Sequence, residues 1–356
     1  MPGQQRLVLD CVIFGLQRFG GISNYWARLL DFAATSPSVA PSLILPQRLM
    51  YSEFDPAWVR RMPVLRERLP VVVTRFMRAV IPESDAAFHT SYYRLPRSRV
   101  SRYIVSAYDF THERYRTGIV RFAHTTQKLA SLRRADAVLC ISHSTKRDIL
   151  DSCRDIDPEK LHVIHLGVDF HTFFRDGGSS TDNENTVLFV GQRRRYKRFD
   201  LAVEALRQCA HLRLGIVGPP LTNLERAMLR ASLGTRWQEF GPVDTAELRR
   251  LYSSAFAFIF PSDYEGFGLP VLEAMACGCP VVAANTSSLP EVGGHAARYA
   301  VEQRGESYAS QLDALATLSI REAAVRNGIA RAGKFSWTKT FEHTFSIYAG
   351  APRIAL

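Results

Sequence analysis

The chain has no long apolar run, no recognisable leader and no short repeat. Its 356 residues contain no stretch of about 18 consecutive apolar residues, which excludes an ordinary membrane-spanning helix. The first ten residues lack the basic and apolar regions of a signal peptide, so we expect the protein in the cytoplasm. There is no internal repeat of short period and no low-complexity tail.

Cysteines are few and scattered. The six are Cys11, Cys140, Cys153, Cys209, Cys277 and Cys279. Cys277 and Cys279 are the only close pair, and no second Cys/His pair completes a zinc site. We therefore expect reduced structural thiols and no metal.

Length and charge define the broad class. A chain of 356 residues exceeds one ordinary core, so two domains are expected. The net charge of +11 favours phosphates, nucleic acid or anionic membranes as partners. Because no basic-aromatic motif accompanies the charge, we expect no nucleic-acid partner.

Part of the positive charge is local. Between Arg60 and Arg102 there are ten arginines against three carboxylates. Within this region, residues 70–82 mix apolar side chains with Arg75 and Arg78. Two interpretations stay open: the segment lies on an anionic bilayer surface, or it is a core helix with a solvated basic edge.

The most informative segment runs from Ala255 to Ala284. The apolar run Ala255–Phe260 predicts a buried strand. A glycine-rich bend follows, then a helix that begins near Pro270, where a missing N–H is tolerated, and ends at Gly278. A second strand is predicted over Val281–Ala284.

Two carboxylates, Glu265 and Glu273, stand on either side of this bend. Free backbone N–H groups at a helix start bind a phosphate or align sugar hydroxyls. The carboxylates would repel a bare anion but can accept hydrogen bonds from a polyol. Loop and carboxylates together predict a sugar-nucleotide site.

Each feature of this segment also has an ordinary structural interpretation. A single Gly-x-Gly at a helix start is usually a tight turn, and a glutamate in a first turn usually complements the helix dipole. The residues Ser288 to Glu291 match a capping box, which needs no ligand. Their combination in one strand-loop-helix unit favours the functional interpretation.

Strands and helices alternate along the chain, which predicts an α/β fold with parallel sheets. The first strand is expected over residues 6–14, followed by a loop from Gly15 to Gly21 and a helix over Ile22–Ala34. Further strands are expected near 42–45, 86–88, 103–107, 137–141, 161–165, 186–190 and 213–218. A polar, glycine-containing stretch over 175–185 is typical of a linker.

The segment from Glu265 to Glu273 resembles the signature of the retaining glycosyltransferases of family 4, in which Gly-Phe-Gly-Leu-Pro follows the first of two glutamates. The similarity extends to Ser288-Leu-Pro-Glu-Val292. The resemblance implies the GT-B fold, with two Rossmann-like domains facing a central cleft. It implies an acceptor-side domain over 1–172, a nucleotide-sugar domain over 173–335, and a terminal helix over 336–356 that packs back on the first domain.

The resemblance also implies roles for individual residues. Glu265 and the loop amides would hold the donor sugar, and Glu273 would bind the nucleotide ribose. Gly20 and Gly21 match a glycine pair that lets the backbone approach the donor diphosphate. Arg193 and Lys197 match the cations that bind the donor phosphates, although Gln192 replaces the usual arginine. The residues implied in the site are Gly20, Gly21, Asp109, Arg193, Lys197, Glu265, Gly266, Phe267, Gly268, Leu269 and Glu273.

One departure concerns the cleft histidine. Many family members have His-Asp where this chain has Tyr108 and Asp109. Two replacements for that histidine stay open: Tyr108 hydrogen-bonds a sugar hydroxyl, or His112 takes the role. His89 lies either in the cleft or packed in the core.

The reaction implied is transfer of a hexose from a nucleoside diphosphate sugar with retention of anomeric configuration and no metal or other cofactor. Asp155 and Asp157 imitate a metal-binding pair but precede a proline turn, so a surface turn is expected there. GDP-mannose is preferred as donor. The expected acceptor is a glycan or lipid-linked glycan of polysaccharide or lipopolysaccharide assembly, which suits a peripheral membrane contact. An epimerase of the same fold and a non-catalytic sugar-binding protein are the alternatives.

Overall fold

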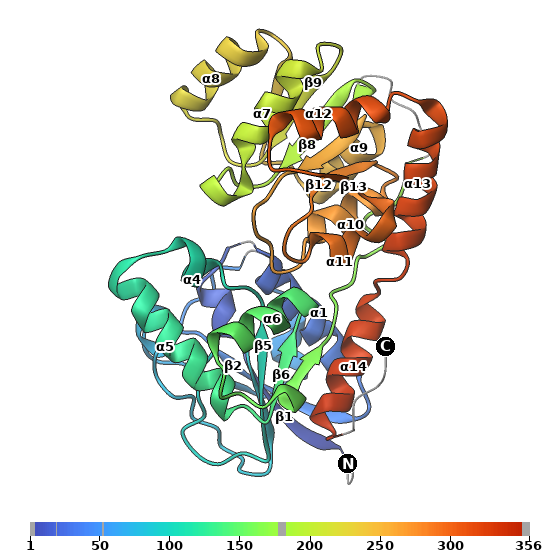
Figure 1. The fold of residues 1–356 in the computed structure, drawn as a ribbon. Helices are drawn as coiled ribbons and strands as arrows, with labels where there is room; N and C mark the ends of the chain where they lie inside the picture. The colour runs from blue at the N-terminus through green and yellow to red at the C-terminus, as the bar shows by residue number, and fades with distance from the viewer. Residues whose placement is uncertain (1–3, 19, 52, 177–182, 351–356) are drawn as a thin grey trace. The chain divides into compact units, whose positions relative to one another are not determined.

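The structure is a computed structural model that describes residues 4–18, 20–51, 53–176 and 183–350. The chain divides into two compact units (Figure 1). Unit 1 comprises the residues up to Leu166 and those from Trp337 onward, and unit 2 comprises Gly167–Ser336.

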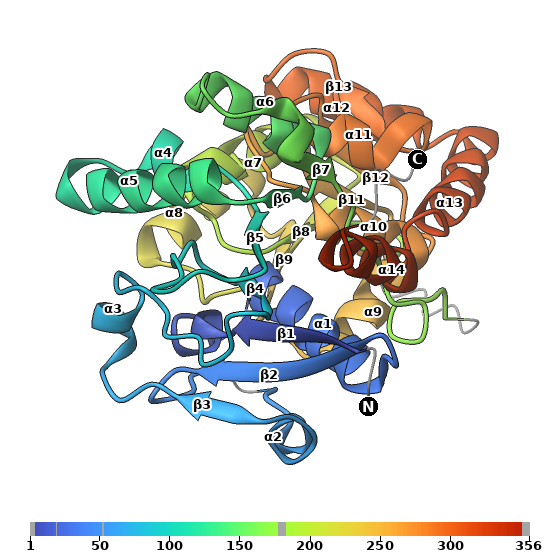
Figure 2. The same ribbon diagram turned by 90° about the horizontal axis from the view of Figure 1, so that it is seen from below.

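Unit 1 is built on a seven-stranded parallel sheet. The order is β3-β2-β1-β4-β5-β6-β7, which can be followed in Figure 2. The strands are β1 (Gln5–Asp10), β2 (Val39–Leu45), β3 (Val64–Arg66), β4 (Ala87–Thr90), β5 (Arg102–Ala107), β6 (Ala137–Cys140) and β7 (Leu161–Val163). Strands β4 and β6 are buried at every position, as expected for parallel strands covered on both faces.

The first strand is shorter than residues 6–14. It ends at Asp10, and a 3₁₀ turn, η1 (Val12–Gly15), follows. The apolar run continues because η1 is also buried, with the Ile13 N–H donating to the Ser91 hydroxyl at 3.1 Å. Because strand and turn are both apolar, the hydrophobic pattern of the sequence does not change where the strand ends.

The helices of unit 1 include the last helix of the chain. They are α1 (Gly21–Thr35), α2 (Pro56–Arg61), α3 (Val71–Thr74), α4 (Thr111–Tyr115), α5 (Gly118–Arg134), α6 (His143–Ser152) and α14 (Trp337–Tyr348), with the short turn η2 (Pro158–Lys160). Helix α14 packs against α1 through aromatic rings, among them Tyr25 against Phe341 at 5.8 Å. Tyr348 at its end bonds to His89 at 2.6 Å and completes the core.

Unit 2 holds a second parallel sheet, of six strands in the order β10-β9-β8-β11-β12-β13. The strands are β8 (Thr186–Val190), β9 (Arg213–Val217), β10 (Trp237–Gly241), β11 (Ala257–Phe260), β12 (Val281–Ala284) and β13 (Arg298–Ala300). The helices are α7 (Phe199–Gln208), α8 (Asn223–Leu233), α9 (Thr245–Ser254), α10 (Leu269–Ala276), α11 (Leu289–Gly293), α12 (Gly305–Ala314) and α13 (Leu318–Ala332), with the turns η4 (Arg195–Lys197) and η5 (Gly294–Ala296).

Both sheets have the strand order of a Rossmann-type doubly wound fold, so the predicted α/β class is confirmed. The order reverses between β1 and β4 in unit 1 and between β8 and β11 in unit 2. Ligands of such sheets bind beyond the carboxyl ends of the strands at the reversal. In unit 2 this places the loops after Val190 and Phe260 side by side.

The basic segment over 70–82 is not a core helix. Only α3, a single turn, is helical, and Val72, Phe76 and Val80 are each about half exposed or more. That interpretation of the sequence is wrong because these apolar side chains face outward. Among the described residues no helix combines the length and apolar character needed to cross a membrane.

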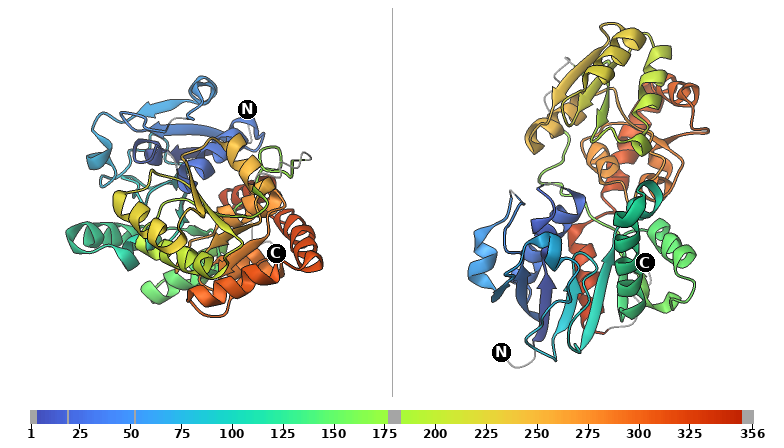
Figure 3. Two further views of the ribbon diagram at one scale, coloured as in Figure 1. Left: turned by 90° about the horizontal axis from the view of Figure 1, so that it is seen from above. Right: turned by 90° about the vertical axis from the view of Figure 1, so that its left-hand side faces the viewer.

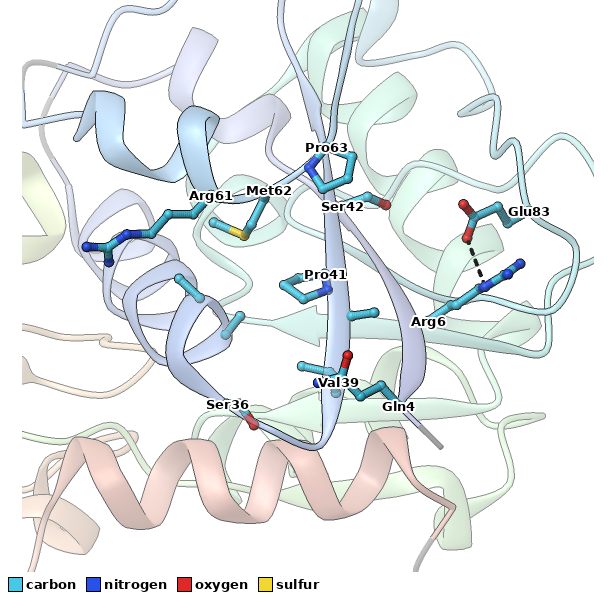
Figure 4. Close-up of a pocket in the computed structure, with 13 residues that line it drawn as sticks. Gln4, Arg6, Ser36, Val39, Pro41, Ser42, Arg61, Met62, Pro63 and Glu83 are labelled. Atoms are coloured by element: carbon cyan, nitrogen blue, oxygen red, sulfur yellow. Dashed lines mark ion pairs between the residues drawn. The ribbon is translucent and has the colours of Figure 1, made fainter. Parts of the chain in front are cut away.

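A pocket of about 380 Å³ opens in unit 1 at the amino ends of β1 and β2 (Figure 4). Arg6 and Glu83 form an ion pair at 3.8 Å on its rim. Because ligands of doubly wound sheets bind at the carboxyl ends of the strands, this pocket lies at the opposite edge from the expected site.

Three minor expectations concern surface and core. The six cysteines are free and buried, as structural thiols should be. Asp155 pairs with Arg133 at 2.8 Å and Asp157 caps η2, so this segment is the expected surface turn. Most of the expected linker, residues 177–182, lies outside the described residues.

Candidate active site

Three glycines shape the carboxyl edge of the unit 2 sheet. Gly191, Gly218 and Gly241 follow or end β8, β9 and β10, and all three have positive φ. The Gly191 N–H donates to the Val217 carbonyl and the Gly218 N–H to the Gly241 carbonyl, each at 2.9 Å. A Cβ on Gly218 would lie 2.4 Å from the Gly191 oxygen, so only glycine lets these turns pack together.

The loop after β11 turns sharply into α10. Gly268 precedes the helix with φ +111°, a conformation that disfavours side chains. Pro270 occupies the first turn, where its missing N–H breaks no helical bond. The strand, bend, helix and final strand predicted between Ala255 and Ala284 are therefore all present.

Lys197 and Glu265 meet between this loop and the loop after β8. The Lys197 Nζ lies 2.5 Å from the Glu265 Oε1, and both side chains are less than one fifth exposed. Two further contacts join the same loops: the Asp263 N–H donates to the Tyr196 carbonyl at 2.8 Å, and Arg198 pairs with Asp263 at 3.3 Å. The predicted phosphate cation and the predicted sugar carboxylate thus lie together.

Ser288 does not form the capping box that its sequence suggests. Its hydroxyl makes no bond to the first turn of α11. Instead it reaches back to the carbonyls of Glu265 and Phe267, at 2.9 and 2.7 Å. The capping-box interpretation is wrong because these carbonyls of the glycine loop take the hydroxyl proton.

Glu273 lies one helical turn inside α10 and is only partly exposed. Burial raises the pKa of its carboxyl to about 7. The same carboxylate contributes, after burial, to raising the pKa of Tyr252 on α9. The Tyr252 hydroxyl is buried and has no hydrogen-bond partner among the described residues. A hydroxyl of a ligand donating to Glu273 would favour the ionised carboxylate.

Arg193, predicted to bind phosphate, is engaged within unit 2. Its Nε donates to Glu225 at 2.7 Å, and its Nη2 donates to the carbonyls of Pro219 and Pro220 at 2.8 and 2.9 Å. Glu225 also closes the capping box of α8 with Thr222. The remaining nitrogen, Nη1, is buried without a partner among the described residues. A phosphate role for Arg193 stays a prediction, and its structural role escaped the sequence analysis.

In unit 1, Gly20 and Gly21 stand where α1 begins, after β1 and η1. Gly20 is the N-cap and Gly21 the first residue of the helix. The Gly20 carbonyl accepts bonds from the Asn24 N–H at 3.0 Å and the Ser23 hydroxyl at 2.9 Å. This glycine pair therefore lies at the strand-order reversal of its own unit.

A buried ion pair that the sequence analysis missed lies at the same reversal. Arg94 donates to Asp10 at 2.9 Å and to Glu67 at 2.6 Å, and Thr90 donates to Asp10 at 2.9 Å. Burial raises the pKa of Asp10, although the neighbouring Arg94 charge opposes that shift. The sequence feature that could have revealed this pair is the charged Asp10 at the end of an apolar strand.

Tyr108 and His89 belong to the core. Tyr108 is buried, and its hydroxyl accepts a bond from the Trp26 ring N–H at 2.5 Å. His89 bonds to Tyr348 at 2.6 Å and to Ser106 at 2.8 Å, and burial lowers its pKa to about 3. Of the two positions proposed for His89, the packed one is right.

Asp109 lies two residues before the start of α4, where its Oδ1 accepts a bond from the Thr111 N–H at 3.0 Å. The buried Lys128 ammonium donates to the main-chain oxygen of Asp109. The predicted site residue is therefore fixed at the carboxyl end of β5.

His112 stacks on His124 with ring centroids 4.4 Å apart. His124 lies 3.1 Å from Glu113, and Lys128 lies 3.3 Å from the same carboxylate. Burial opposes ionisation of Glu113, but the His124 bond and the Lys128 charge bring its pKa down to about 2. Burial and the His124 ring lower the pKa of His112.

Two family models match consecutive parts of the sequence. Residues 171–331 match the model described as Glycosyl transferases group 1. Residues 56–172 match the model described as Glycosyltransferase Family 4. Together the two matches, both to models that describe glycosyltransferases, span residues 56–331. The resemblance carried by the Glu265–Glu273 segment is confirmed.

The relatives of this chain include two named enzymes. It is 44% identical over 119 residues to O-antigen chain mannosyltransferase B of Escherichia coli, over 32% of this chain and 31% of that protein. It is 30% identical over 231 residues to D-inositol 3-phosphate glycosyltransferase of Mycobacteroides abscessus, over 60% of this chain and 52% of that protein. The matches therefore span about a third and about half of the length of these relatives.

Solved structures share the fold of this chain along nearly its whole length. Sucrose-phosphate synthase from Thermosynechococcus elongatus superposes with a TM-score of 0.76 at 19% identity, covering 98% of this chain and 99% of that one. The expected GT-B fold class is confirmed.

Proposed function

We propose that this chain transfers a hexose from a nucleoside diphosphate sugar to a glycan or lipid-linked glycan acceptor, with retention of anomeric configuration. The observation that carries the proposal is the Lys197–Glu265 pair at the carboxyl edge of β8 and β11, beside the glycine loop that leads into α10. A cation and a carboxylate at this point suit a ligand with an anionic diphosphate at one end and sugar hydroxyls at the other.

In the proposed reaction the bond between the anomeric carbon and the diphosphate oxygen breaks, and a bond to an acceptor oxygen forms on the same face. The acceptor proton passes to the leaving phosphate. Lys197, with Arg193, neutralises charge that builds on the departing diphosphate, so the proposal includes no metal or other cofactor. Glu265 holds the sugar and stabilises the positive charge that develops on its ring, and Glu273 accepts bonds from the nucleotide ribose.

We propose a GDP-mannose-type donor and an acceptor of cell-surface polysaccharide assembly. The name of the Escherichia coli relative, an O-antigen chain mannosyltransferase, supports both choices. The identity of 44% covers only part of each chain, so donor and acceptor require direct tests.

The first test is thermal shift of the purified chain against GDP, UDP, ADP and their hexose derivatives. Stabilisation by GDP and GDP-mannose above the other pairs is expected. Incubation of GDP-mannose without acceptor separates the alternatives: an epimerised sugar in the absence of transfer would indicate an epimerase instead. Binding with neither transfer nor epimerisation across a panel of lipid-linked acceptors would leave a sugar-binding protein.

We further propose that unit 1 meets an anionic membrane from the cytoplasmic side. Ten apolar side chains in two segments are between 41% and 83% exposed. They form the surface that we call the apolar-arginine surface: Leu69, Val72, Val73, Phe76, Met77, Val80, Tyr115, Ile119, Val120 and Phe122. Helix α3 and the amino-terminal end of α5 project from the same side of unit 1 (Figures 2 and 3).

The charge of these segments suits anionic lipid. Their exposed arginines are Arg66, Arg68, Arg78, Arg114, Arg116 and Arg121. The single carboxylate between residues 65 and 80, Glu67, is paired with the buried Arg94. Arginines beside exposed apolar side chains match a bilayer whose phosphates surround an apolar interior. The Gln127 amide donates to the Arg75 carbonyl and ties the two segments together.

Vesicle flotation tests this contact. Binding to vesicles that contain phosphatidylglycerol, weakened by salt and absent with phosphatidylcholine alone, is expected. The triple variant Phe76→Ser, Ile119→Ser, Phe122→Ser should stay unbound. A matched control in unit 2, Leu224→Ser, Val301→Ser, Leu318→Ser, changes equally exposed residues and should bind. Equal binding of both triples would overturn the contact, and a change of oligomeric state in the first would assign the surface to self-association.

A further inference from the structure

Three consecutive hydroxyl residues after β12 hold the backbone of the glycine loop. Thr286 donates to the Ser262 carbonyl at 2.9 Å. The Ser287 hydroxyl oxygen accepts a bond from the Glu265 N–H at 2.9 Å. The Ser288 hydroxyl shares its proton between the carbonyls of Glu265 and Phe267, at 2.9 and 2.7 Å. We call residues 286–288 the hydroxyl clasp.

The clasp contains a strained residue. Ser287 has φ +49°, a left-handed conformation that is unfavourable for a residue other than glycine. Such strain persists only where surrounding contacts enforce it. The next residue, Ser288, is fully buried, so water does not compete for the hydrogen bonds of its hydroxyl. The strained residue is therefore the one whose hydroxyl accepts the bond from the Glu265 N–H.

The bonds of Ser288 also set the direction of two amides. In a trans peptide the carbonyl of one residue and the N–H of the next point in opposite directions. With the carbonyls of Glu265 and Phe267 turned toward Ser288, the N–H groups of Gly266 and Gly268 point the other way. These are two of the loop amides predicted to hold the donor sugar.

From this geometry we infer that Thr286, Ser287 and Ser288 are positioning residues for the sugar half of the donor, an inference that rests on the proposed function. Their side-chain hydrogen bonds go to backbone atoms of the loop, and they act through it. Ser287 and Ser288 fix the backbone on both sides of Glu265, so its carboxylate is in place for the sugar hydroxyls without reorganisation when the donor binds. Preorganised groups of this kind stabilise a transition state more than flexible ones.

The test compares GDP-mannose with GDP, because the clasp acts on the sugar site and not on the diphosphate site. Ser288→Ala should weaken GDP-mannose binding about tenfold, the effect of losing a buried hydrogen bond, and leave GDP binding unchanged. Ser287→Gly relieves the strain and removes the acceptor together. It should keep or raise the thermal stability and still weaken GDP-mannose binding, which a merely structural role would not produce. Ser287→Asn tolerates positive φ, retains an acceptor and should restore much of the binding.

A matched control is available in the same loop. The Ser262 hydroxyl is buried and makes no hydrogen bond in the described part of the chain, so Ser262→Ala removes a hydroxyl without removing a bond. It should bind both ligands as the parent does. If Ser288→Ala and Ser287→Gly match Ser262→Ala in the ratio of GDP-mannose to GDP affinity, the inference is overturned.

Hydrogen exchange of the free protein separates this inference from the proposed function. The Glu265 amide should exchange faster in Ser287→Gly than in the parent, with Ser262→Ala unchanged. If the parent binds no nucleotide sugar, the proposed function fails while the exchange result still decides whether the clasp holds the loop. An unchanged exchange rate of the Glu265 amide in Ser287→Gly would show that the clasp does not hold the loop.

Discussion

The Lys197 ammonium and the Glu265 carboxylate lie 2.5 Å apart, and they join the loops that follow two adjacent strands, β8 and β11. Each charge is partly shielded from water and satisfied by the other. An anionic diphosphate would compete with Glu265 for Lys197, which would leave the carboxylate to the sugar hydroxyls. The pair therefore links the two halves of the proposed donor in one contact.

Removing either charge of this pair should have a distinct effect. Glu265→Gln should lower transfer by about 10²–10³-fold, as loss of a transition-state contact does. Its GDP affinity should be unchanged or raised, because the diphosphate no longer competes with a carboxylate for Lys197. Lys197→Met should weaken both GDP binding and transfer. Turnover of the donor and calorimetric GDP binding measure the two effects. Arg194→Met is the control, because that side chain is exposed and donates to the neighbouring Gln192. Normal transfer by Glu265→Gln would show that the Glu265 carboxylate has no role in the reaction.

The affinity for nucleotide should depend on pH through Glu273. Its pKa is raised to about 7 in the folded protein, so the carboxyl is partly protonated at neutral pH. Ribose hydroxyls donate to the ionised form, and binding should tighten by up to about tenfold per pH unit as pH rises toward 7. Calorimetry with GDP between pH 5.5 and 8 measures the profile. Glu273→Gln should lose this component, and an unchanged profile would contradict the role.

The same shift predicts an effect on stability in the absence of ligand. A carboxyl whose pKa rises on folding binds more protons in the native state than in the unfolded state. Its contribution to stability is full below the unfolded value near 4.5 and is lost as pH rises toward 7. Glu273→Gln should therefore gain stability relative to the parent at pH 8 compared with pH 5, measured by urea unfolding.

Gly268→Ala should destabilise unit 2 by roughly 1–3 kcal/mol, because the position has φ +111°. The added Cβ would also lie 2.9 Å from the Leu289 side chain. Gly333→Ala is the matched control, since that glycine is right-handed and its added Cβ meets ordinary contacts; it should be neutral or stabilising. Urea unfolding of the two variants gives the comparison, and equal stabilities would contradict a strained turn.

Stability should fall in acid through His89. Its pKa is lowered to about 3 by burial, so the folded protein keeps the ring neutral while the unfolded chain takes up a proton near pH 6.5. Between those values the loss approaches about 1.4 kcal/mol per pH unit. In His89→Gln the unfolding free energy should no longer show this part of its dependence on pH. In the control His295→Gln, which changes an exposed residue, the dependence should remain. Parallel pH profiles for parent and His89→Gln would refute the assignment.

The fold was largely predictable because the strands of parallel sheets are buried on both faces and appear as apolar runs. The strands Thr186–Val190 and Val281–Ala284 have the bounds expected of them. The first strand was overextended because η1 is as apolar as the strand before it. Segment 70–82 has the composition of an amphipathic helix, but only the structure shows its apolar residues facing outward.

The site was less predictable where a side chain has several possible partners. The spacing of Glu265 and Glu273 located the loop. Lys197 was predicted only as a phosphate-binding cation, and the structure shows it against Glu265. The pattern at Ser288 predicts a cap for its own helix, yet the hydroxyl bonds a loop more than twenty residues earlier. Arg193 pairs with Glu225, which is 32 residues away. Such contacts depend on which strands lie adjacent, a relation that local spacing does not contain.

Helix α14 has a consequence for the order of events during synthesis. Tyr348 supplies the hydroxyl that satisfies His89 in the middle of the unit 1 sheet, and Phe341 and Phe345 fill the same core. A ribosome makes all of unit 2 before it reaches these residues. Unit 1 therefore emerges first but completes its core last, and until then the aromatic side chains of α1 that contact α14, among them Tyr25, stay uncovered. A nascent chain stalled before Trp337 should be the form that engages chaperones.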